Sequence, residues 1–159
     1  MKHDDLWDFA LTYYAQPGVE AACLELQSAG ADVCLVLAGV WLERRGLACD
    51  EARLRQLKAV SDDWRAQVVA PLRDLRQTWR QQAAVDSYLA DLRARVKKLE
   101  LDAEHIQLRR LQSTAQQWPA VKGPVDWLGR LSTDLNGQPR ALIETLRRAA
   151  ATQPSDEGS

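Results

Sequence analysis

The sequence predicts an all-α protein, a compact multi-helix bundle built around one buried central helix. Three observations lead to this prediction: an apolar stretch bracketed by helix-capping residues, a long segment with a coiled-coil repeat, and Pro and Gly residues that separate amphipathic segments. We find no segment with the alternating pattern of a half-buried strand. With 159 residues, the chain is long enough to bury a core as about one domain.

The central helix is expected over about residues 33–45. From Val33 to Leu42 there is no charged or polar side chain, so a helix made from this stretch is apolar all round and has to be surrounded by protein. Asp32 is a suitable N-cap, and Gly46 can take the left-handed position after the last turn. The stretch is too short to cross a bilayer, which needs roughly 20 residues.

Residues 1–82 are expected to form a helical core around this element. A first helix is expected over residues 6–15, and a second follows Pro17 and ends at Gly30. Asp50 is the N-cap expected for a fourth helix. Short connections between successive helices imply antiparallel packing.

An arginine stripe follows Trp64. If the helix stays regular, apolar side chains from Trp64 to Trp79 share one side and four arginines occupy the side next to it. Guanidinium groups bind phosphate or carboxylate groups well. More commonly, however, such arginines face solvent or pair with acidic residues of the same chain. Pro71 either kinks this helix or breaks it. The candidate binding face consists of Arg65, Arg73, Arg76 and Arg80.

Residues 83–118 are expected to hold a long amphipathic helix, at about residues 86–117, that packs on the core or projects from it. Its apolar residues recur at alternating steps of four and three, which is the repeat of a coiled-coil seam. Such a helix can fold back on its own domain or pair with another copy. The candidate interface seam consists of Leu89, Leu92, Val96, Leu99 and Ile106.

Residues 119–151 are expected to form a C-terminal helical pair. Pro124 can begin a short helix that Asn136-Gly137 ends, and Pro139 can start the last helix. Residues 152–159 are expected to be a disordered tail.

Composition indicates which classes of function to expect. The net charge is -1, which argues against a general nucleic-acid or membrane-surface binder, although residues 1–50 carry an acidic excess and residues 51–110 a basic one. The N-terminus has no apolar segment typical of a secretory signal, so a cytoplasmic location is expected. The three cysteines fit neither a disulfide framework nor a zinc motif, and we expect reduced, buried thiols.

The residue types needed for catalysis are sparse. His3 and His105 are the only histidines, and neither has the partners of a catalytic base or a metal ligand. Asp5 and Asp8 have the spacing of a magnesium-binding pair, but acidic residues also belong at a helix N-terminus. No catalytic residue, cofactor or metal site is expected, and an enzyme with carboxylate or Tyr14 chemistry is the least favoured reading.

Three segments resemble an uncharacterised family of small proteobacterial proteins known only as a domain of unknown function. They are Asp5 to Leu24, Asp32 to Leu42, and Trp64 to Arg76, which includes Val68-Val69-Ala70-Pro71-Leu72-Arg73. The resemblance covers roughly residues 5–110. It implies a bacterial cytosolic helical protein and transfers no site residue, activity or cofactor.

The sequence therefore favours a non-enzymatic helical module that binds a protein partner or another copy of itself through the arginine face, the seam, or both. The alternative is that the same arginines bind nucleic acid or a phosphorylated ligand. Ionic strength separates the two, because phosphate contacts weaken steeply with salt whereas an apolar seam is nearly indifferent to it.

Overall fold

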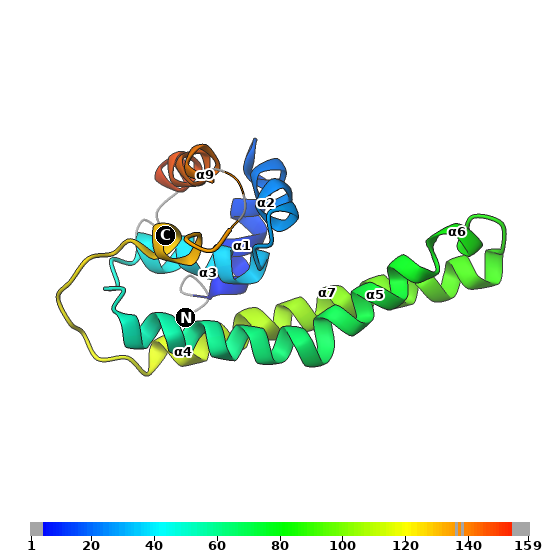
Figure 1. Cartoon of the computed structure of the whole chain (residues 1–159), viewed down its shortest axis with the longest axis horizontal. Helices are drawn as coiled ribbons and strands as arrows, with labels where there is room; N and C mark the ends of the chain where they lie inside the picture. The colour runs from blue at the N-terminus through cyan, green and yellow to red at the C-terminus, as the bar shows by residue number, and fades with distance from the viewer. Residues whose placement is uncertain (1–4, 136, 138, 154–159) are drawn as a thin grey trace.

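The computed structural model describes residues 5–135, 137 and 139–153, and every regular element within these ranges is a helix. The predicted all-α fold class is therefore confirmed. Figure 1 shows a globular group of short helices and a long helical hairpin, which passes beneath this group and projects beyond it.

The central helix α3 (Val33–Arg44) lies in the globular part, where the sequence predicts it. Every residue from Cys34 to Leu42 is buried. Asp32 caps the helix, since its carboxylate accepts hydrogen bonds from the backbone N–H groups of Cys34 at 3.1 Å and Leu35 at 3.5 Å. Gly46 follows the last turn with a left-handed φ of 69°.

Short helices from both ends of the chain cover α3. Gly39 lets one of them approach closely, because a Cβ atom at this position would lie 2.8 Å from Leu131 Cδ1. Tyr13, which is fully buried, donates a hydrogen bond to the carbonyl of Leu146 at 2.6 Å and so joins the first helix to the last. These helices are α1 (Leu6–Tyr14), α2 (Val19–Ser28), α8 (Trp127–Leu131) and α9 (Arg140–Thr152).

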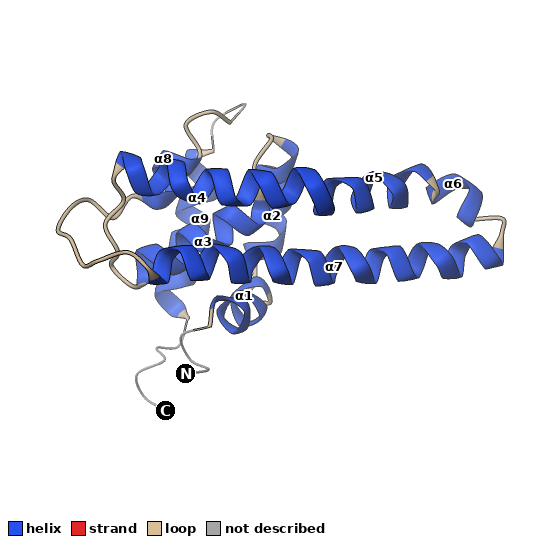
Figure 2. Cartoon of the chain, turned by 90° about the horizontal axis from the view of Figure 1, so that it is seen from below, coloured by secondary structure: helices blue, strands red, loops and turns tan. Residues whose placement is uncertain are grey.

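The hairpin consists of two antiparallel arms that lie side by side in both views (Figures 1 and 2). The second arm is the predicted long helix, α7 (Ser87–Gln116). Its C-terminal half packs against α1 and α3, and its N-terminal half projects from the globular part. The helix therefore combines the two arrangements, packing on the core and projecting from it, between which the sequence does not decide. The first arm consists of α4 (Glu51–Trp64), the π-helical turn η2 (Arg65–Val69), α5 (Ala70–Thr78) and α6 (Arg80–Ala83).

The expected boundary between residues 82 and 83 falls at the tip of this hairpin. Helices α5 and α6 leave the globular part together with the facing half of α7. The boundary differs because α5 and α6 pack on α7. The apolar pattern of each helix by itself does not specify this packing.

Pro71 does not break the first arm. The N–H of Ala70 donates to the carbonyl of Arg65, five residues earlier, which is the hydrogen bond of a π-helical turn. This wider turn precedes the proline, whose ring crowds the carbonyl four residues before it in a regular α-helix. The extra residue also rotates the apolar side of the arm, so Val69 is buried where a regular helix predicts Val68.

The C-terminal helices differ in detail from their predicted bounds. Helix α8 begins at Trp127 with Asp126 as its N-cap, three residues after Pro124. Thr152, which the sequence assigns to a tail, is the last residue of α9, and residues 154–159 lie outside the described residues. Among the helices that the structure describes, none is long and apolar enough to cross a membrane.

A buried polar cluster joins α3 to the hairpin. Asp32 Oδ2 accepts a hydrogen bond from Ser61 Oγ at 2.6 Å, and Gln107 Nε2 donates to both oxygens of Asp32 at 2.9 and 3.2 Å. Gln107 also donates to Ser61 Oγ at 2.7 Å. Ser61 and Gln107 are buried, so these bonds satisfy polar groups that water does not reach and fix the position of the hairpin on α3.

This cluster predicts the stability of two cap variants. Asp32→Ala should lower the free energy of unfolding by about 2–4 kcal/mol, because it removes a helix cap and leaves buried polar groups unpaired. Asp50→Ala is the matched control, since Asp50 is exposed and its carboxylate accepts from Arg53 N as a cap; we expect it to cost about 1 kcal/mol. Urea unfolding followed by circular dichroism measures both values, and equal losses would contradict this account.

Candidate functional site

A buried carboxylate on α7 lies between two arginines of α5 and joins the two arms of the hairpin. Glu100 of α7 is only 5% exposed. Its Oε2 accepts a hydrogen bond from Arg73 Nε at 2.9 Å, and its two oxygens accept from Arg76 Nε at 2.6 Å and Arg76 Nη2 at 3.2 Å. Two of the four predicted arginines therefore hold the arms of the hairpin together.

Glu100 and its neighbour Glu104 respond to this environment in opposite directions. Burial disfavours the charge on Glu100, but the hydrogen bonds from Arg76 and Arg73 outweigh it, and the pKa of Glu100 lies below its usual value. The pKa of Glu104 is raised, first by burial and then by the nearby charges of Glu100 and Asp32, because Arg73 compensates only in part.

The structure does not bring the four arginines of the candidate binding face together. Arg65, in the π-helical turn, lines a small polar cavity with Asp32, Arg73 and Glu104. This cavity of about 10 Å³ has room for no more than a water molecule. Arg80 lies on α6 and is exposed.

The seam residues on α7 divide between two environments. Val96 is buried and Leu89 is half-buried, whereas Leu92, Leu99 and Ile106 are 45%, 53% and 41% exposed. The fully buried side of α7 shares Val96 with the predicted seam and otherwise lies beside it. It consists of Val96, Glu100, Ala103, Gln107, Leu108, Leu111 and Ala115.

The exposed seam residues share one face of the hairpin with residues of the first arm. Each residue turns an α-helix by about 100°. Leu99 directly precedes Glu100, and Leu75 directly precedes Arg76, so in an antiparallel pair both leucines point to the same face, away from the ion pair. Near the globular part, Ile106 and Val60 line one open groove of about 350 Å³ on this face.

We refer to this surface as the open face. The globular helices pack on the opposite side of the hairpin, and no other described element crosses the open face in Figure 2, where the two arms lie in front. At its proximal end, the guanidinium of Arg110 stacks over the ring of Trp64, 4.2 Å from its centroid. The open face consists of Val60, Leu75, Leu92, Leu99 and Ile106.

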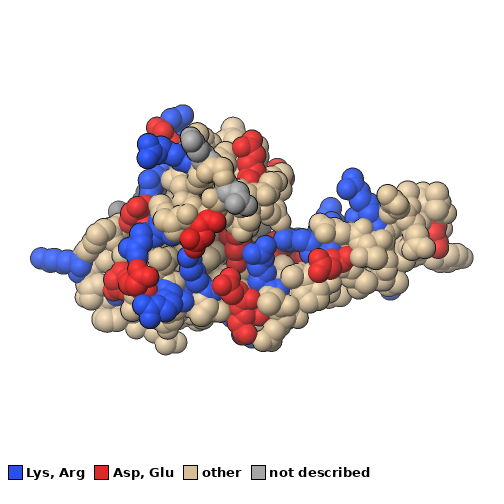
Figure 3. Space-filling view, viewed as in Figure 1, with Lys and Arg blue, Asp and Glu red and all other residues tan. Residues whose placement is uncertain are grey.

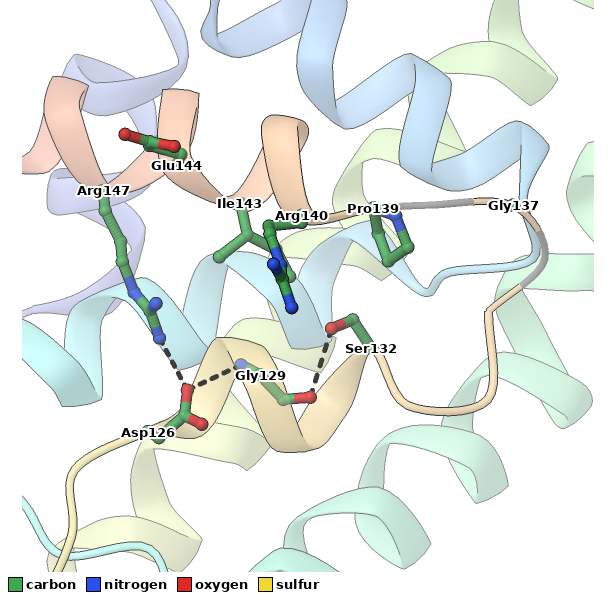
Figure 4. A pocket seen from close by; sticks show the side chains of 9 residues that line it. All are labelled: Asp126, Gly129, Ser132, Gly137, Pro139, Arg140, Ile143, Glu144 and Arg147. Carbon is green, nitrogen blue, oxygen red and sulfur yellow. Dashed lines mark hydrogen bonds and ion pairs between the residues drawn. The ribbon is translucent and has the colours of Figure 1, made fainter.

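A groove between α8 and α9 is a second candidate site, with a volume of about 800 Å³ (Figure 4). Several of its polar groups already have structural roles. Arg147 binds Asp126 at 2.6 Å and Glu43 at 2.9 Å, and the Ser132 hydroxyl donates to the carbonyl of Gly129 at 3.1 Å. The described residues that line this groove include no His, Cys or Tyr that pairs with Ser132, so the groove does not assemble a nucleophile and base.

The other candidate groups also have structural surroundings. His105 stacks on Trp7 with ring centroids 4.0 Å apart, and His3 lies outside the described residues. Asp5 caps α1 by accepting from Trp7 N at 2.7 Å, and Asp8 is exposed. Burial raises the pKa of Tyr14 to about 12. None of these groups that the structure describes lines the groove between α8 and α9, the small polar cavity at Arg65 or the groove at Ile106.

The cysteines are buried free thiols, as the sequence predicts. Burial raises the pKa of Cys23 to about 12, so this thiol stays protonated and unreactive at neutral pH. In the part of the chain that the structure describes, no group of three or more His, Cys, Asp or Glu side chains is placed to hold a metal ion.

Charged side chains of both signs are interspersed over the face of the molecule that Figure 3 shows. The basic excess of residues 51–110 is partly neutralised within the structure, since Arg73 and Arg76 contact Glu100 and Lys58 lies 3.8 Å from Asp134. This face therefore lacks the single-sign surface typical of a nucleic-acid binder.

Sequence reasoning did not identify Glu100. The heptad pattern draws attention to apolar positions, and Glu100 lies beside the seam rather than in it. The available signal was the arginine surplus on the preceding helix, which requires an acidic partner wherever that helix is covered. The identity of that partner depends on how the two arms align.

Substitution of Glu100 and substitution of Glu104 should change the free energy of unfolding in opposite directions. Glu100→Gln should lower the free energy of unfolding at pH 7 by about 2–4 kcal/mol, because it leaves two arginines without their buried counter-charge. It should also reduce the loss of stability below about pH 4, since a carboxylate with a lowered pKa contributes stability that disappears as it is protonated. Glu104→Gln should raise stability at pH 7, because a raised pKa means that the ionised group destabilises the folded state. Urea unfolding from pH 3 to pH 8 tests both, and losses of equal size at pH 7 would contradict this assignment.

Comparison with known proteins agrees with the resemblance seen over residues 5–110. The chain matches the family described as "Protein of unknown function (DUF2390)" over residues 5–111, a segment that includes α1 to α6, most of α7 and every residue of the open face. No curated protein and no solved structure matches the chain. Since the match covers more than half of the sequence, the chain belongs to this family of proteins of unknown function.

Proposed function

We propose that this protein is a non-enzymatic helical module that binds a protein partner through the open face of its hairpin. The observation that supports this proposal is the line of Leu92, Leu99 and Ile106, which are seven residues, or about two helical turns, apart and each about half exposed. Exposed apolar side chains aligned along one face of a helix suit association with another protein.

The hairpin suits such a role because contacts between its arms and with the globular helices hold it in one position. Glu100 and the two arginines that bind it hold the arms in register, while the globular helices fix the hairpin at its base. A rigid two-helix surface binds a partner without the entropic cost of ordering a flexible segment.

The nucleic-acid alternative has less support. Its best candidate groups, Arg73 and Arg76, would have to give up a buried carboxylate in order to bind phosphate. Arg65 lines the same small cavity as Arg73, next to the carboxylates of Asp32 and Glu104, and Arg80 lies apart on α6.

The proposal also places the protein in the cytoplasm of a bacterium. The buried free thiols support a reducing compartment, and the resemblance to a proteobacterial family supports the source.

Capture experiments with the tagged 159-residue chain test the proposed function. Leu99→Asp should reduce the yield of a bound protein at least tenfold, because a carboxylate in an apolar contact is costly to desolvate. Leu101→Asp is the matched control, since Leu101 is 56% exposed on the same helix but points about 200° away from Leu99. We expect it to bind like the wild type, and nuclease or 0.5 M salt should not release the partner. Equal loss in both variants, or recovery that depends on nucleic acid, would overturn the proposal.

A further inference from the structure

The exposed apolar residues of α7 are spaced symmetrically about Leu99. On α7, Leu92 and Ile106 lie seven residues on either side of Leu99, so an antiparallel second α7 centred on Leu99 places Leu92 opposite Ile106 and Leu99 opposite its own copy. We propose that the partner is a second copy of this chain, packed antiparallel on the open face to form a four-helix bundle from two hairpins. This inference rests on the proposed function and names its partner.

Charges beside the apolar line agree with the same register. Arg95 and Asp102 are exposed on the side of α7 that carries the open face, four residues before and three residues after Leu99. Within the described chain, neither forms an ion pair with another residue. In the antiparallel pair, Arg95 of each copy lies beside Asp102 of the other, about one residue, or 1.5 Å along the helix axis, from the position directly opposite. Because the contact is two-fold symmetric, it forms two equivalent ion pairs between Arg95 and Asp102.

The size of the face meets the requirement of a stable dimer. In this register, residues 87–111 of α7 overlap with their copy over about 37 Å, and two adjacent helices are about 20 Å wide. The face therefore offers on the order of 750 Å², close to the value of about 800 Å² per partner in a standard interface. The globular helices pack on the opposite side of the hairpin, so they do not obstruct a second copy.

Charge reversal tests both the partner and the register. Sedimentation equilibrium of the full chain, between 1 and 100 µM at low salt, should give a dimer for the wild type. Arg95→Asp alone places two carboxylates opposite each other at both contacts, and Asp102→Arg alone does the same with two arginines. Each should weaken the dimer about tenfold. An equimolar mixture of the two variants should restore dimerisation, and so should the double variant R95D/D102R.

The outcomes separate this inference from the proposed function. Weakening in each single variant, followed by recovery in the double variant R95D/D102R, supports the antiparallel register. In a parallel pair, positions 95 and 102 each face their own copy, so the double exchange leaves like charges opposed. A wild type that stays monomeric at 100 µM, or charge variants that dimerise like the wild type, overturns the inference. If a monomeric wild type still captures a different protein and loses it on Leu99→Asp, the proposed function stands and the second copy is wrong. If it captures none, both are wrong.

Discussion

The ion pair of Glu100 with Arg73 and Arg76 is the interaction on which the projecting hairpin depends. Neither α5 nor α6 has a buried residue, so the outer half of the hairpin lacks an apolar core of its own. Two arginines on one buried carboxylate supply a directional contact in its place, with hydrogen bonds that fix the rotation of each helix as well as their separation. Removing the carboxylate leaves two half-buried arginines without their counter-charge, which is why this cluster specifies one alignment of the arms.

This alignment decides which residues stay outside. Glu100 and Arg76 face each other between the arms. The residues directly before them, Leu99 and Leu75, are each turned by about 100° and therefore lie together on the open face. At the base of the hairpin, the hydrogen bonds that Asp32 makes with Ser61 and Gln107 hold the globular helices on the side away from these leucines. An apolar face is thus kept available along the hairpin by polar contacts made on its other side.

Elements set by local pattern were predictable from the sequence, and those set by distant contacts were not. Continuous apolar residues and the Asp32 cap identify α3, and the spacing of apolar residues identifies the length of α7. The π-helical turn before Pro71 was not predictable, because a proline is compatible with a kink or a break until the packing around it is known. The buried side of α7 shares only Val96 with the predicted seam, since Glu100 and Gln107 occupy buried positions that an apolar pattern assigns to solvent.

Disulfide trapping across the open face tests the central claim most directly, because it reports which residues meet. The native cysteines are buried, so an added surface cysteine reacts without competition. Under mild oxidation, we predict that Leu99→Cys forms a covalent dimer, that Leu92→Cys links to Ile106→Cys only when the two variants are mixed, and that Leu101→Cys stays monomeric. Monomers throughout, or crosslinking of Leu101→Cys as efficient as that of Leu99→Cys, would contradict the account.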